Sequence, residues 1–247
     1  MRVRESALKT TCIRRAVQEM GKDQLMIEFY RVRYASPDLT DDSGALVQFS
    51  CEGCVPLGEL LGLRTGFERS LASLTHRIIC DMLAGLRMPN DGAVVLPPHI
   101  RVGTVPSEPV FIGTLTLLEN LRYVTGNTRV PEKTVWTLCK HVGLPSHLCS
   151  SAKGQQVMAR LSFSLSSAEL SLFSLVRTLL SMPDLLLINK LPIADEASCA
   201  KIGVVLQDFV AVSDYMHMLA CLSACVNVAC RTVWPTSAHL SLRMGMS

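Results

Sequence analysis

Apolar positions follow two different periods along the chain, and each period predicts its own kind of element. Residues 165–182 place apolar side chains three and four positions apart, which is the spacing of one helix face. Leu185 to Ile188 is an unbroken apolar run between turn residues, typical of a strand buried on both faces of a parallel sheet. The same criteria predict strands at 26–34, 46–49, 93–96, 102–105 and 231–233, and helices at 78–86, 115–123 and 130–142. Helices that alternate with short apolar strands indicate an α/β fold.

The remaining segments carry weaker patterns. Residues 1–22 are mixed and charged, and we interpret them as a leader without a fold signal. Residues 35–44 are rich in aspartate, proline and glycine and predict turns. Residues 209–230 are mostly apolar, but Asp214 and His217 interrupt them, so they predict one or two buried helices rather than a membrane span.

The composition fits one globular domain. The 247 residues can bury one large core, and residues 23–247 are assigned to it. A net charge of +3 is too small to indicate a nucleic-acid partner. The N-terminal residues lack the apolar segment of a secretory signal, so we expect a cytoplasmic protein.

Ten cysteines are scattered along the chain, and we expect them to be reduced and mostly buried. Cys51 and Cys54 have a spacing that zinc sites use, but a tetrahedral site needs two more ligands, usually from a second close pair. Cys221, Cys225 and Cys230 have helical spacing within an apolar segment instead. No metal site is therefore predicted.

Two adjoining stretches carry a family resemblance. Leu165-Ser-Ser-Ala-Glu169 leads through the predicted helix, without a gap, into Pro183-Asp-Leu-Leu-Leu-Ile-Asn-Lys190. This order resembles the second half of ABC-type ATPase domains, in which "LSGGQ" leads by a helix to "PDLLLLDEP". Further segments that keep the order of the family are 27–29, 82–92, 105–121, 176–184 and 231–239.

The resemblance implies a P-loop NTPase-like α/β fold of the ABC ATPase type. Such a fold has a mostly parallel core sheet, an antiparallel β edge and a helical subdomain, here expected at about residues 115–182. The family binds ATP and Mg²⁺, so these would be the cofactors that the resemblance implies.

The phosphate loop of the family, G-x-x-x-x-G-K-[ST], aligns with Ser70 to Arg77. Its glycines let backbone N–H groups cradle phosphates, and here the glycine positions hold Ser70, Ser73 and Thr75. His76 replaces the lysine that would hold the β- and γ-phosphates, and Arg77 replaces the magnesium-binding hydroxyl. We interpret the segment as a connection between a strand and a helix that has lost its ligand; an anion site at Arg77 is the alternative.

Asn189 and Lys190 stand where the family has the magnesium-positioning aspartate and the water-activating glutamate. An amide is a poorer ligand than a carboxylate for a hard cation. An ammonium group of ordinary pKa cannot accept a proton at pH 7, so the general base is missing. Lys190 is interpreted as a solvated or paired side chain, or alternatively as a group that neutralises a γ-phosphate without cleaving it.

The resemblance implies that the signature loop would face a partner's γ-phosphate across a dimer interface. Ser166 keeps the serine of the loop, which begins at Leu165. Ser167 and Ala168 replace two glycines, and Glu169 replaces the glutamine. A carboxylate aimed at a phosphate is repulsive at close range.

Three further positions complete the implied site. Ser107 stands at the place of the metal-sensing glutamine, and Tyr34 lies two residues from the place of the adenine-stacking aromatic, which is Ser36. His239 is the candidate for the switch histidine.

Each position that would touch ATP differs from the family pattern, whereas the apolar framework persists. The leading hypothesis is a pseudo-ATPase at the cytoplasmic face of a membrane, the inactive half or regulatory partner of a transporter. Its partners would be a second ABC ATPase domain, in a homodimer or heterodimer, and membrane domains on another chain. The alternatives are a scaffold that binds no nucleotide, a weak ATPase that uses Lys190 and Arg77, and a drifting gene product without a selected role.

Overall fold

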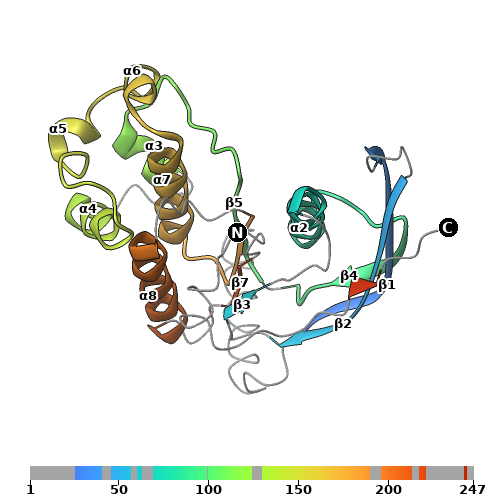
Figure 1. Ribbon diagram of the computed structural model, residues 1–247. Coiled ribbons are helices and arrows are strands. Elements are labelled where there is room, and N and C mark those ends of the chain that lie inside the picture. Colours follow the sequence, from blue (N-terminus) through green and yellow to red (C-terminus); the bar gives the residue numbers. More distant parts are fainter. Residues whose placement is uncertain are drawn as a thin grey trace, which may run out of the picture.

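The computed structural model describes residues 26–40, 46–56, 60–62, 69–98, 100–123, 130–189, 196–212, 217–220 and 242–243. These residues form a mixed α/β fold with two sheets, and helices lie between the sheets and beyond them (Figure 1).

One sheet is antiparallel throughout its described strands. Its order is β4 (Asp91–Val95), β1 (Met26–Thr40), β2 (Leu46–Pro56) and β8 (Leu242–Arg243). Side chains 26–30 of β1 alternate between solvent and the core, as period-2 patterning requires, with Ile27 and Phe29 buried. Gly92 of β4 has φ +80°, and a Cβ there would lie 2.3 Å from the carbonyl oxygen of Tyr30, so this close approach requires glycine.

The other sheet is parallel throughout its described strands. Its order is β3 (Leu60–Gly62), β7 (His217–Ala220), β6 (Leu185–Ile188) and β5 (Val102–Val105). All four residues of β6 are buried, which confirms the strand predicted from its unbroken apolar run. Leu185 and Leu187 belong to one hydrophobic core, and Leu186 and Ile188 belong to the other.

Helix α2 (Arg69–Leu83) packs in the first of these cores, together with side chains of the antiparallel sheet. Ile78, Ile79, Met82 and Leu83 are its buried apolar residues. Figure 1 shows α2 between the strands β1 and β2 on one side and the parallel sheet on the other. The core around α2 therefore joins the two sheets.

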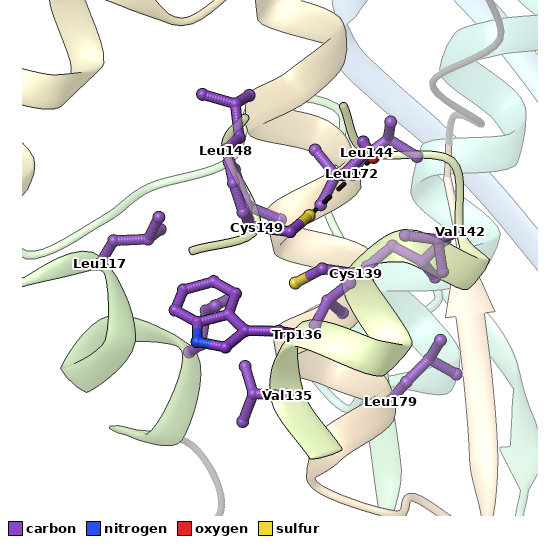
Figure 2. Packing of buried hydrophobic residues seen from close by; sticks show 14 of the residues in the cluster. Leu117, Val135, Trp136, Cys139, Val142, Leu144, Leu148, Cys149, Leu172 and Leu179 are labelled. Carbon is purple, nitrogen blue, oxygen red and sulfur yellow. Dashed lines mark hydrogen bonds between the residues drawn. The ribbon is translucent and has the colours of Figure 1, made fainter. Parts of the chain in front are cut away.

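The second core lies on the opposite face of β6 and holds most of the helices. These helices are α3 (Leu117–Tyr123), α4 (Glu132–His141), α5 (Ser151–Gly154), α6 (Met158–Leu161), the 3-10 helix η2 (Ser162–Ser164), α7 (Ser167–Leu180) and α8 (Glu196–Val212). Trp136 and Cys139 of α4 lie in this core together with Leu172 and Leu179 of α7 (Figure 2). No helix in the described ranges is both long and apolar enough to cross a bilayer.

The ion pair between Arg101 and Asp184, at the start of β5 and β6, holds the second core against the sheet. The Arg101 guanidinium donates to both carboxylate oxygens of Asp184, at 2.8 and 3.2 Å, and to the carbonyl oxygen of Met182. The hydrogen bond to Asp184 raises the pKa of Arg101, so the guanidinium keeps its charge. A Cβ at Gly103 would lie 2.8 Å from Pro183 and Thr178, so glycine lets β5 approach the turn after α7.

Several sequence predictions need correction. The helix expected at 78–86 begins nine residues earlier, at Arg69. The predicted strand 26–34 continues to Thr40, through a segment expected to be turns. The antiparallel strands form a sheet of their own rather than an edge of the parallel sheet.

The region expected to be helical at 209–230 holds the strand His217–Ala220, and α8 was not predicted. Residues 1–22 and the strand expected at 231–233 lie outside the described residues.

Because β6 joins both cores, we expect truncation on either of its faces to destabilise the whole fold. Leu186→Ala and Leu187→Ala should each lower the free energy of unfolding by about 2–5 kcal/mol, measured by urea denaturation. Leu86→Ala, at a side chain exposed beyond the end of α2, is the control and should change it by less than about 0.5 kcal/mol. A β6 substitution as mild as the control would contradict a strand shared by both cores.

Candidate functional site

The carboxyl edge of the parallel sheet brings two of the predicted site residues together. The Asn189 N–H donates to the carbonyl oxygen of Val105 at 3.2 Å, so Asn189 lies beside the end of β5. Ser107 follows β5 by two residues and lies at the same edge. This is the edge at which ligands of parallel sheets usually bind. Lys190 lies outside the described residues.

Residues 70–77 do not form the expected connection between a strand and a helix, because all of them lie within α2. Compared with an expected start at Ile78, the nine extra residues lengthen the helix by about 13 Å. Thr75 and His76 are buried, with exposed fractions of 2% and 1%, whereas Arg77 is exposed. His76, at the position aligned with the lysine of the phosphate loop, is thus a core residue of the helix.

The helical path also changes what the backbone of this segment can bind. Beyond the first turn of a helix, each backbone N–H donates to the carbonyl four residues earlier. From Ser73 to His76 the N–H groups are therefore committed to α2. A phosphate loop needs these groups free and convergent on an anion.

The signature loop forms the N-terminal cap of α7. The Ser166 N–H and hydroxyl donate to Glu169 Oε2, at 2.7 and 2.8 Å, and the Glu169 N–H donates to Ser166 Oγ at 3.2 Å. These bonds form a capping box, in which serine and glutamate satisfy each other's backbone donors. Leu165 lies just before the cap, and Ser167 and Ala168 are the first residues of α7.

The cap engages the carboxylate of Glu169 within the chain. Its Oε2 atom accepts hydrogen bonds from the N–H and the hydroxyl of Ser166. A negative charge in this position interacts favourably with the positive end of the helix dipole. The anion that the N-terminus of α7 attracts is therefore supplied by the chain itself.

Tyr34 lies in the antiparallel sheet as a buried side chain. The ring packs on Phe49 with centroids 5.6 Å apart, and the Arg87 guanidinium lies 5.5 Å from its centroid. Arg87 also donates to the hydroxyl of Tyr34. The ring is 7% exposed, so little of it is available for stacking on an adenine. His239 lies outside the described residues.

Two polar residues that sequence reasoning did not assign to the site organise its surroundings. Asn120 is buried; its amide accepts from Ile112 N–H at 2.8 Å and donates to the carbonyls of Ile112 and Thr116 at 3.0 Å. Arg177 of α7 donates to the carbonyl of Val110 at 2.8 Å and lies 4.8 Å from the Phe111 ring centroid. Together they hold the segment after β5 against the helices. The signal in the sequence was their position in two of the segments that keep the order of the family, 105–121 and 176–184.

The described residues contain no group of three or more His, Cys, Asp or Glu side chains that could hold a metal ion. Of the Cys51–Cys54 pair, one thiol is buried in β2 and the other is exposed, so the pair does not converge on one point. The cysteines at 221, 225 and 230 lie outside the described residues.

Comparison with known proteins supports the fold. No protein-family model matches the sequence, and the search of curated proteins gives no match. Among solved structures, the chain is similar to one described as a metal-chelate type ABC transporter in an inward-facing conformation. The TM-score is 0.58 at 14% identity, over 90% of this chain and 82% of that chain. At this identity the likeness shows an ABC-related fold and no more.

The capping box at α7 can be tested by stability. Ser166→Ala removes the hydroxyl that accepts from Glu169 N–H, and should lower the free energy of unfolding by about 1 kcal/mol in thermal or urea denaturation. Ser167→Ala, one residue further on, is the matched control and should be close to neutral. Equal effects of the two substitutions would show that Ser166 is not the cap.

Proposed function

We propose that this chain is a degenerate ABC nucleotide-binding-domain-like protein that does not hydrolyse ATP. It serves as the inactive half, or a regulatory partner, of a transporter, and acts through contacts with protein rather than through nucleotide chemistry. The observation that carries this proposal is the helical path of residues 70–77. Its partners would be membrane domains on another chain and a second ABC domain, which would place it at the cytoplasmic face of a membrane.

Three features argue against ATP chemistry at this chain's own residues. The backbone donors of residues 73–76 are committed to α2, and His76 is buried within the core. The serine of the signature loop is bonded to Glu169. Asn189, at the sheet edge, offers an amide where magnesium prefers a carboxylate.

An exposed apolar patch supports a role in binding protein. We define the patch as Val110, Ile112, Val157 and Phe163; Val110 and Phe163 are 76% and 93% exposed. Its two segments lie side by side, because Met158 and Ala159 donate backbone hydrogen bonds to Leu115 and Gly113, at 2.9 and 3.0 Å. Exposed apolar side chains on adjoining segments commonly mark sites of protein contact.

Arg177 fixes the backbone of the patch at Val110. Its guanidinium holds the Val110 carbonyl and lies over the ring of Phe111, and its burial lowers its pKa. Because α7 carries this side chain, the patch is fixed to a rigid element of the second core. A surface held in this way loses little conformational entropy when a partner binds.

We expect ATP–Mg²⁺ to give no saturable heat in isothermal titration of the pure chain, which corresponds to a Kd weaker than about 1 mM. An ABC ATPase with a complete phosphate loop, titrated under the same conditions, is the positive control. Saturable binding would contradict the proposal. Phosphate release that is lost in Lys190→Ala would instead support the weak ATPase.

The patch can be tested by capture from detergent-solubilised membranes of the source cells. The double substitution Val110→Asp with Phe163→Asp should reduce recovery of a membrane-protein partner at least about tenfold, because charge at a hydrophobic contact must be desolvated on binding. Met88→Asp is the matched control, since Met88 is 81% exposed and lies in the turn after α2. Equal recovery with both variants, each folded by circular dichroism, would exclude the patch as the contact surface.

A further inference from the structure

Cys139 and Cys149 form a close pair of thiols inside the second core. Cys139 lies in the last turn of α4, and Cys149 lies ten positions later, in the connection to α5. Figure 2 shows the two sulfur atoms turned toward one another. Their exposed fractions are 0% and 7%, so Cys149 is the one that borders solvent.

The surroundings make the two thiols unequal. The neighbouring Cys139 thiol lowers the pKa of Cys149, burial opposes this shift, and the charge of Lys140 adds to the lowering. The neighbouring Cys149 thiol, together with burial, raises the pKa of Cys139. Cys149 is therefore the more readily ionised of the two thiols. The Cys149 thiol donates a hydrogen bond to the carbonyl oxygen of Leu144, with 3.9 Å between Sγ and O.

We infer that Cys139 and Cys149 are a dithiol–disulfide modification site that responds to small hydroperoxides. The Cys149 thiolate attacks the hydroperoxide, cleaves its O–O bond and becomes a sulfenic acid, while the leaving alkoxide or hydroxide takes up a proton. The Cys139 sulfur then attacks the Cys149 sulfur; the S–S bond forms, the S–O bond breaks, and water leaves with the Cys139 proton. With hydrogen peroxide, two thiols and one peroxide give one disulfide and two waters.

The packing around the pair restricts which oxidants can reach it. Trp136, Leu144, Leu148 and Leu172 surround the two sulfurs as buried side chains (Figure 2). A small neutral peroxide needs less space than a bulky disulfide reagent, which favours the hydroperoxide as oxidant. The resulting bond would tie the end of α4 to the start of α5 and remove conformational freedom from the unfolded chain.

Cys51 shows by contrast what an inert buried thiol of this chain looks like. It is buried in β2, and burial raises its pKa to about 12. A thiol with so little thiolate at neutral pH is a poor nucleophile. This residue is therefore a matched internal reference for Cys149.

The test treats the reduced full chain with an equimolar amount of hydrogen peroxide, alkylates the remaining thiols and maps the peptides by mass spectrometry. The expected main product is a disulfide between Cys139 and Cys149 that dithiothreitol reverses. It should form at least about tenfold faster than the Cys51 thiol is lost. The oxidised chain should also melt at a higher temperature than the reduced chain.

Two variants separate the roles of the thiols. Cys139→Ser should stop the reaction at a Cys149 sulfenic acid that dimedone traps, and Cys149→Ser should leave Cys139 unoxidised. Cys51→Ser should still form the disulfide. The inference is overturned if the wild-type chain yields no Cys139–Cys149 disulfide, or if it forms no faster than Cys51 is lost; this result does not require either serine variant to fold. Because the inference does not involve nucleotide or the patch, its failure leaves the proposed function untouched.

Discussion

The burial of β6 on both faces is the constraint on which the rest of the structure depends. Leu185 and Leu187 pack toward α2 and the antiparallel sheet, while Leu186 and Ile188 pack toward α7 and its neighbours. Four consecutive apolar residues are needed because alternate positions of a strand face opposite sides. The Arg101–Asp184 ion pair and the close approach of Gly103 to Pro183 and Thr178 fix where this strand begins. The carboxyl edge, with Asn189, is positioned as a consequence.

The residues at the positions aligned with the phosphate loop explain why this segment is helical. A phosphate loop depends on glycines that adopt backbone conformations unfavourable for other residues. Ser70, Ser73 and Thr75 carry a Cβ atom and have better helix propensity than glycine, so extending α2 back to Arg69 costs less. Asn120 and Arg177, in contrast, serve the framework and keep their hydrogen bonds. This contrast between residues 70–77 and the framework is the physical basis for proposing a partner-binding role.

Local signals in the sequence were sufficient to predict β6 and α7. The apolar run of β6 and the Ser166–Glu169 pattern at the start of α7 each specify their element without help from distant residues. The resemblance to the family gave Glu169 a role toward phosphate, although the capping box was readable from the same two residues. The start of α2 was missed because the resemblance imposed a loop on residues whose own propensity allows a helix. The strand at 217–220 was missed because a short apolar run fits a buried helix or strand equally well.

Amide hydrogen exchange of residues 73–76 tests the central claim most directly, because it reports whether these backbone donors are committed to a helix. We predict slow exchange that matches the rest of α2 and stays unchanged when millimolar ATP–Mg²⁺ is added. Fast exchange in the absence of nucleotide, with strong protection on adding ATP–Mg²⁺, would identify a working phosphate loop and contradict the account.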